Sequence, residues 1–280
     1  MKWTIAFDAG CDMRNFDSIE AAHLELVPLT IQLGSHSIVD NGETSLEDFQ
    51  KMLDEESGKT GTACPSVGSW HEVMEKGENV IAITISGSVS GSYQSATIAR
   101  EMILEDEPDR NIFVMDSVSG SGTMEFLVRK AVELIEKGCS FEEVCKGIQD
   151  YRKNSQIFFL LQNIDNVMSN GRLNPIIGRA IKALKLCMLA TVSPEGTMDV
   201  IAKVRTFNKT MDKSIDECIK RGCTGKRIII SHCLNEKGAL VMKEKLLARF
   251  PQAEIEIRRT GLLCGYYAEK GGLIVALQDE

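Results

Sequence analysis

The sequence predicts an α/β protein of two domains, the first built on a parallel sheet and the second, smaller one on a mixed sheet. In the first half, short apolar runs alternate with helical patterns, and several runs end in turns rich in serine, threonine and glycine. Parallel strands need such crossover helices, which cover both faces of the sheet. In the second half, two strands joined by a short turn predict a hairpin, and strand–helix units follow it. We place the boundary between the domains after residue 158.

In the first half, strands are predicted at residues 2–8, 24–33, 81–85 and 111–116, with residues 37–40 as a hairpin extension around Gly34. Helices are predicted at residues 46–53, 66–77, 91–103, 123–137 and 140–153. Residues 57–65 are predicted to form a loop. Its Gly58-Lys59-Thr60 sequence resembles the end of a P-loop. However, Leu53 stands where the motif requires its first glycine, and a helix precedes the loop where a strand is required. A P-loop is therefore excluded.

In the second half, strands are predicted at residues 157–161, 186–192, 198–204, 227–231, 254–258 and 271–277. Helices are predicted at residues 176–185, 209–220 and 236–250. The strands at 186–192 and 198–204 flank the turn Ser193–Thr197, which contains proline and glycine and predicts the hairpin.

Composition excludes several classes of function. The chain has 280 residues and a net charge of −8, which argues against a broad nucleic-acid surface because backbone binding needs a basic stripe. No apolar run approaches the length of a membrane span, and the N-terminus lacks a signal-peptide pattern, so we expect a cytoplasmic protein. The nine cysteines form no CxxC pair and no cluster with zinc-like spacing, so we expect reduced thiols and no metal site.

The segment from Ile81 to Ala96 combines a buried strand, a turn of small hydroxyl and glycine residues, and the start of a helix. Free backbone N–H groups, serine hydroxyls and the positive end of a helix dipole suit a phosphate or a carboxylate. On this segment alone, an ordinary turn with a serine cap is the slightly favoured interpretation. A serine hydrolase is not indicated, because Val89 stands at the centre of the G-x-S-x-G pattern where the nucleophile should be.

Turns that follow parallel strands share one edge of the sheet, where ligands bind in open α/β folds. Residues 8–12, 60–66, 86–92 and 116–121 are therefore expected to line one cleft between the domains. Arg172, on a glycine turn, is the candidate cation from the second domain. The apolar stretch 176–189 fits a packed core and also the lining for an elongated apolar ligand. These residues predict an anion-binding, hydroxyl-lined cleft but no reaction.

Several motifs occur together in the order and rough spacing of one family. They are Thr62–Ser66, Ile85–Ala96, Met115–Ser117 and Gly171–Leu173, with Val27–Leu29 and Asp40–Gly42 also fitting. In this combination the chain resembles the DegV family over essentially its whole length. The resemblance implies a DegV-like two-domain fold, with a parallel-sheet α/β/α domain at 1–158 and a smaller mixed-sheet α/β domain at 159–280. It also implies a long-chain fatty acid bound between the domains, with no other cofactor.

The resemblance assigns the carboxylate of that fatty acid to the hydroxyls of Thr62 and Ser90, helped by the backbone around Gly91 and Ser92. Such hydrogen bonds to a charged group contribute about 1.5–3 kcal/mol each, and each buried methylene about 0.8 kcal/mol. The tail is therefore expected to supply most of the affinity and the hydroxyls the orientation.

The resemblance also assigns residues near the ligand head group and residues that face a partner protein. Arg172 matches the family's glycine–arginine motif near the ligand head group, and Lys203 and Arg205 resemble a basic pair that faces a separate fatty acid kinase. That kinase phosphorylates the carboxylate to an acyl phosphate, so the resemblance implies a carrier without catalysis of its own.

The chain departs from the family at three places. A less hydroxylated turn stands at residues 8–12, Cys187-Met188 replaces a usual lysine–proline pair, and Tyr267 stands near the position of a usual histidine by the head group. These departures bear on the kinase more than on the ligand. The alternative function from the residues alone is an enzyme acting on a small phosphorylated or acylated metabolite in the same cleft.

Overall fold

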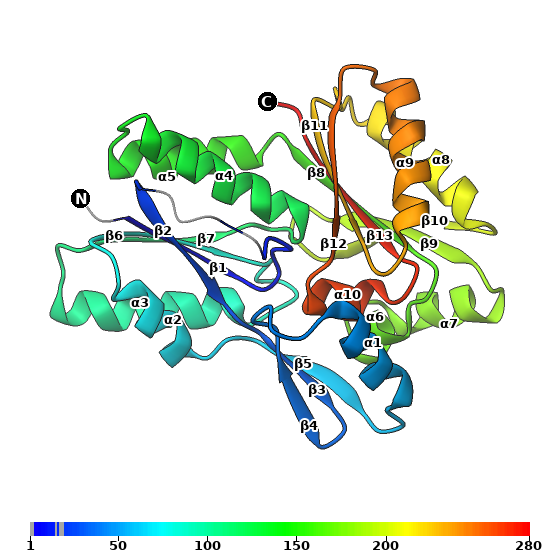
Figure 1. Ribbon diagram of the computed structural model, residues 1–280, viewed down its shortest axis with the longest axis horizontal. Coiled ribbons are helices and arrows are strands. Elements are labelled where there is room, and N and C mark those ends of the chain that lie inside the picture. Colours follow the sequence, from blue (N-terminus) through cyan, green and yellow to red (C-terminus); the bar gives the residue numbers. More distant parts are fainter. Residues whose placement is uncertain (1–2, 15, 17–19) are drawn as a thin grey trace.

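The first half of the chain forms a parallel sheet between two layers of helices, as predicted (Figure 1). The computed structural model describes residues 3–14, 16 and 20–280. The strand order is β2-β1-β6-β7, and every pairing is parallel. The strands are β1 (Trp3–Asp8), β2 (Ala22–Val27), β6 (Asn79–Thr84) and β7 (Asn111–Asp116). The helices α2 (Val67–Met74) and α3 (Ser92–Asp106) cover one face, and α4 (Gly122–Glu136) and α5 (Phe141–Arg152) the other.

The second half forms a six-stranded mixed sheet, which confirms the second part of the predicted fold class. Its order is β10-β9-β8-β13-β11-β12, in which only β11 and β12 pair in parallel. The strands are β8 (Ser155–Leu161), β9 (Cys187–Val192), β10 (Met198–Val204), β11 (Arg227–His232), β12 (Glu254–Arg259) and β13 (Leu273–Gln278). The helices α8 (Phe207–Lys220) and α9 (Glu236–Arg249) pack against one face of this sheet. The predicted β9–β10 hairpin is confirmed.

Three short helices lie on the side of the second sheet that faces away from α8 and α9: α6 (Asp165–Ser169), α7 (Pro175–Ala183) and α10 (Leu262–Ala268). The sequence predicted α7 but neither α6 nor α10. Both unpredicted helices are short, with five and seven residues, and six of the seven residues of α10 are buried. A helix buried on nearly all sides shows no amphipathic period.

The predicted strand at residues 24–33 is wrong, because it consists of two strands in different sheets. Pro28 separates β2 from β3 (Thr30–Leu33), and β3 pairs with β4 (His36–Val39) and β5 (Thr60–Ala63) in a small antiparallel sheet. The sequence placed β5 in a loop. With α1 (Leu46–Glu55), this small sheet packs against the second half, since Ile31 and Phe49 share a core with Tyr266.

The two halves are tightly joined along α4. Its first residue, Gly122, lies against Ile229 of β11 and Ala276 of β13, where an added Cβ would approach their side chains to 2.9 Å. The chain enters the second sheet at Ser155, four residues before the predicted boundary after residue 158. Within the described residues, no helix is long and apolar enough to cross a lipid bilayer.

Candidate functional site

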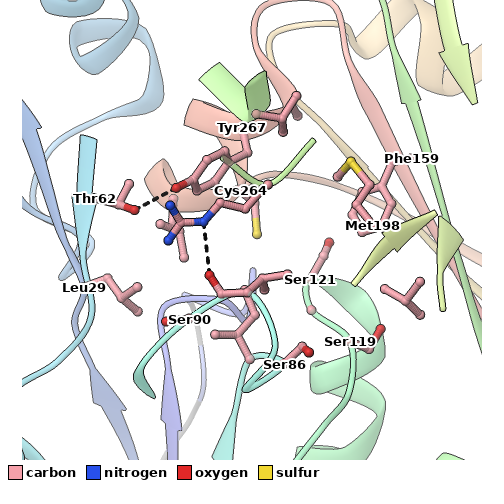
Figure 2. Close-up of a pocket in the computed structure, with 18 of the residues that line it drawn as sticks. Leu29, Thr62, Ser86, Ser90, Ser119, Ser121, Phe159, Met198, Cys264 and Tyr267 are labelled. Atoms are coloured by element: carbon pink, nitrogen blue, oxygen red, sulfur yellow. Dashed lines mark hydrogen bonds between the residues drawn. The ribbon is translucent and has the colours of Figure 1, made fainter. Parts of the chain in front are cut away.

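A cavity of about 340 Å³ lies between the two halves of the molecule (Figure 2). One wall comes from β5 and from the loops after β6 and β7, at the carboxyl edge of the parallel sheet. The other wall comes from β8, the β9–β10 hairpin and α10. Most of its lining is apolar, and its volume falls in the range of small-molecule sites. Three of the four turns expected in the cleft contribute to it; residues 8–12 lie behind the wall, and the Gly10 carbonyl accepts a hydrogen bond from Ser121 there.

Thr62 and Tyr267 form a hydroxyl pair at one side of the cavity, with their oxygens 2.7 Å apart. Two residues earlier on the same face of β5, Thr60 forms a second pair with Tyr266, also at 2.7 Å. The Thr62–Tyr267 pair has two O–H protons and uses one for its mutual hydrogen bond. The remaining proton can be donated to a ligand in the cavity. Burial raises the pKa of Tyr267, against the opposing effects of Thr62 and Arg172, so its phenol is neutral at pH 7.

Arg172 lies over the same pair, with its guanidinium carbon 5.9 Å from the centre of the Tyr267 ring. Its Nε donates to the Val89 carbonyl at 3.1 Å and its Nη1 to the Asn170 carbonyl at 2.5 Å, which holds the side chain across the cleft. The turn before it requires Gly171, whose φ is +75°. Of the described residues that line the cavity, Arg172 alone carries a formal charge. The cavity is therefore suited to an anion.

Ser90 and Gly91 line the cavity, and Ser92 does not. The Ser90 oxygen accepts the Ser92 backbone N–H at 3.3 Å, while the Ser92 hydroxyl is buried and donates to Asp8 at 2.5 Å. Asp8 also accepts the N–H groups of Ile85 and Gly10, and its burial raises the pKa of its carboxyl to about 6. The Ser92 hydroxyl therefore does not face the cavity, and Ser92 contributes only its backbone, at the start of α3. Ser90 lines the cavity.

Two serines of the β6–α3 loop attach it to the β9–β10 turn of the other half. The Ser86 hydroxyl donates to the Gly196 carbonyl at 2.8 Å, and the Ser88 hydroxyl donates to the Glu195 carbonyl. Gly196 is needed in this contact, because its φ is +85° and an added Cβ would meet the Ser86 oxygen at 2.2 Å. These bonds place the turn over the cavity.

Lys203 and Arg205 are exposed at the end of the edge strand β10 and do not line the cavity. Cys187 and Met188, where the chain departs from the family pattern, also lie outside the lining, on β9. The sequence missed the contribution of α10 beyond Tyr267, namely Leu263, Cys264 and Ala268. A usable signal was the apolar run 262–268 after Gly261.

The fold and the cavity define a two-domain α/β protein with a ligand cleft between its halves, apolar along most of its length and cationic near a hydroxyl pair. The chain belongs to the DegV family, whose family profile matches residues 2–279. It is similar to a DegV domain-containing protein of Streptococcus gordonii, with 35% identity over 279 residues and 99% of each chain covered.

Two solved structures show the same fold along the full chain. The B3 protein of the fatty acid kinase of Streptococcus pneumoniae, loaded with linoleic acid, is 35% identical, with a TM-score of 0.96 and 100% of each chain covered. A DegV family protein of Eubacterium eligens, loaded with heptadecanoic acid, is 28% identical, with a TM-score of 0.92 and 99% of this chain and 100% of that one covered.

Proposed function

We propose that this protein binds a long-chain fatty acid in the cavity between its halves. The observation that carries the proposal is the placement of Arg172 and the Thr62–Tyr267 hydroxyl pair beside an otherwise apolar cavity. A fatty acid has the matching shape, with one anionic end and a long apolar tail. The fatty acids loaded into the two solved relatives support the same ligand class.

The carboxylate is assigned to the side of the cavity formed by Thr62, Ser90 and Arg172, with Tyr267 behind Thr62. The tail extends along the apolar lining contributed by Phe159, Leu161, Val167, Met198 and Ile274. Each buried methylene contributes about 0.8 kcal/mol, so the tail supplies most of the affinity. The polar residues fix which end of the ligand faces them.

Native mass spectrometry of the purified protein tests the ligand class. We expect a bound mass that dissociates as a fatty acid, and binding of added oleic acid after delipidation. Ser90→Ala is expected to weaken binding of that acid, whereas Ser95→Ala on α3 is the matched control because Ser95 does not line the cavity. Protein that stays ligand-free in the presence of oleic acid would overturn the proposal.

The protein further acts, in this proposal, as a carrier that presents the carboxylate to a separate fatty acid kinase. The basic pair Lys203 and Arg205, exposed at the end of β10 and just after it, is assigned to the partner surface. Charge reversal of both residues is expected to slow acyl phosphate formation by a purified fatty acid kinase with ATP while leaving fatty acid affinity unchanged. Equal rates for the variant and the wild type would remove these residues from the interface.

The rival function, an enzyme for a small phosphorylated or acylated metabolite, is favoured by the serine-rich loops at the carboxyl edge of the parallel sheet. Turnover of such a metabolite by the isolated chain, abolished by Asp116→Asn or Arg172→Gln, would favour the enzyme.

A further inference from the structure

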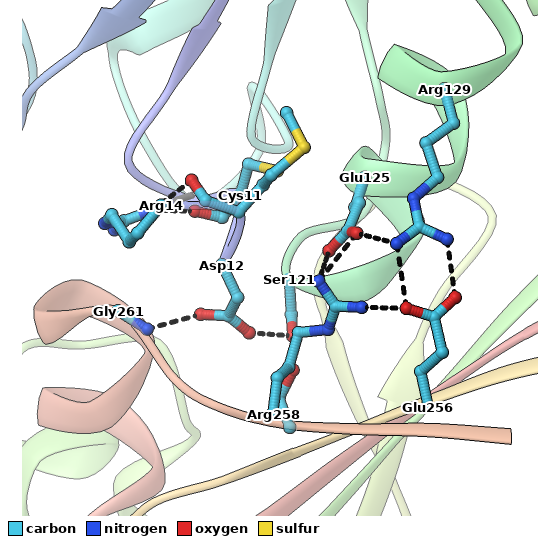
Figure 3. A network of polar contacts seen from close by, with 11 residues as sticks. Cys11, Asp12, Arg14, Ser121, Glu125, Arg129, Glu256, Arg258 and Gly261 are labelled. Carbon is cyan, nitrogen blue, oxygen red and sulfur yellow. Dashed lines mark hydrogen bonds and ion pairs between the residues drawn. The ribbon is translucent and has the colours of Figure 1, made fainter. Parts of the chain in front are cut away.

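Two buried carboxylates hold the first turn of α10, the helix that carries Tyr267. The N-cap of α10 is Gly261, which has no side chain to satisfy the free N–H groups of the first turn. Asp12 accepts the Gly261 N–H at 2.8 Å, and Asp40 accepts the Leu263 N–H at 2.8 Å (Figure 3 shows the first of these bonds). Both aspartates come from segments more than 200 positions away along the chain.

Arg14 completes this group, which we call the α10 anchor (Asp12, Arg14 and Asp40). Its Nη2 pairs with Asp40 at 2.9 Å, and its Nη1 donates to the Cys11 carbonyl. Arg14 also lies directly against Gly261, where an added Cβ would approach Nη2 to 2.0 Å. The α10 anchor therefore fixes the position of the first turn of α10 closely. Any side chain at residue 261 would displace the Arg14 guanidinium.

Asp12 also connects α10 to a second wall of the cavity. Its other carboxylate oxygen accepts the hydroxyl of Ser121, a cavity-lining residue in the loop before α4 (Figure 3). Ser121 has a φ of +53°, a conformation that costs a non-glycine residue energy and that surrounding contacts must hold in place. One buried aspartate thus joins the β7–α4 loop to the start of α10.

The α10 anchor lies at the start of α10, and Tyr267 lies near the end of the same short helix. Tyr267 follows Leu263 by four residues, about 6 Å along the helix axis, so a shift or rotation of the first turn is transmitted to the phenol. The phenol must lie within hydrogen-bond distance of Thr62, which belongs to β5 of the small antiparallel sheet. The 2.7 Å contact between them therefore depends on where α10 begins.

We propose that Asp12 and Asp40, with Arg14, are positioning residues for the ligand head group: they place α10 so that Tyr267 meets Thr62 and leaves one O–H directed to the carboxylate. The part that concerns the carboxylate rests on the fatty-acid function proposed above. The part that concerns Tyr267 holds in the ligand-free protein and is tested there first.

The ligand-free test uses ¹⁹F NMR of protein labelled with 3-fluorotyrosine. The chain has four tyrosines, and Tyr→Phe variants assign their signals. Asp12→Ala and Asp40→Ala are expected to shift or broaden the Tyr267 signal and leave that of Tyr93 unchanged. Asp279→Ala is the matched control, because Asp279 accepts two backbone N–H groups, from Thr224 and Gly225, far from α10. Should an alanine variant fail to fold, Arg14→Lys, which keeps the charge and loses the forked contact, replaces it. An unmoved Tyr267 signal in the folded variants would overturn the inference.

The ligand test measures oleic acid affinity in a double-mutant cycle with Tyr267→Phe. Each anchor variant alone is expected to weaken binding about tenfold, the scale of one hydrogen bond to a charged group. In the Tyr267→Phe background Asp40→Ala is expected to cost almost nothing, because its effect passes through the phenol, and Asp12→Ala is expected to keep only the loss that passes through Ser121. Additive losses would refute the positioning role, whereas a wild-type protein that binds no oleic acid would refute the fatty-acid function and leave the NMR result to decide the placement of Tyr267.

Discussion

Thr62→Val removes one hydroxyl from the cavity and keeps the size and branching of the side chain. In the proposed complex, the Thr62–Tyr267 pair, whose oxygens are 2.7 Å apart, donates one O–H to the carboxylate and is oriented by its mutual hydrogen bond. A hydrogen bond to a charged group is worth about 1.5–3 kcal/mol, so fatty acid affinity is expected to fall roughly tenfold to 150-fold.

Isothermal titration of delipidated protein with oleic acid and with methyl oleate measures this effect. The ester has the same tail but no charge, so Thr62→Val is expected to change its affinity by less than about twofold. Thr60→Val is the matched control, since it breaks the Thr60–Tyr266 bond of equal length on the same strand, and Thr60 does not line the cavity. Its affinity for oleic acid is expected to match the wild type.

Two results would refute this reasoning. If Thr62→Val lowers the affinity for the acid and for the ester equally, the threonine shapes the cavity and does not bind the head group. If Thr60→Val weakens the acid as much as Thr62→Val does, both pairs act only by holding β5 against α10.

Three further predictions follow from the same structure. Arg172→Gln removes the charge from the cavity lining and is expected to abolish the preference for oleic acid over methyl oleate; titration with both ligands checks this, and an unchanged preference contradicts it. Cys64 is an exposed thiol at the cavity wall, so saturating oleic acid is expected to slow its alkylation by iodoacetamide, measured by peptide mass spectrometry; equal rates with and without ligand would place the head group elsewhere. Burial raises the pKa of Glu269 from 4.5 to about 7, so the folded state binds its proton more tightly than the unfolded state does. This contribution to stability is full below about pH 4.5 and lost as the pH rises to about 7, so Glu269→Gln is expected to flatten the pH dependence of urea unfolding by as much as about 3 kcal/mol; an equally steep wild-type and variant profile contradicts it.

The sequence predicted the two sheets because their signals are local. A buried run such as residues 111–116 and the caps of the helices around it are readable within a few positions of the chain. The loops after β6 and β7 were correctly expected at the cavity because parallel strands bring their carboxyl ends to one edge. The anion-suited cleft could therefore be anticipated before its walls were known.

The missed elements depend on partners distant in the chain. Thr60–Ala63 forms a strand because β3 offers it an edge; its two threonines favour a strand, but Gly61 and Ala63 between and after them do not. The start of α10 is held by Asp12 and Asp40, which no local pattern connects to Gly261. The bond between the Ser92 hydroxyl and Asp8 of the first strand likewise joins distant positions and is not indicated by any local pattern.

The packing of Gly122 of α4 against β11 and β13 makes the two walls of the cavity parts of one folding unit. A ligand held between them then stabilises the whole chain by mass action, by about 2.7 kcal/mol when its free concentration is a hundred times its Kd. On the proposed function, the bound fraction and the cellular lifetime of the protein are therefore linked. Copies without a fatty acid are expected to unfold and meet proteases more often than loaded copies, so the amount of protein is expected to follow the supply of its ligand.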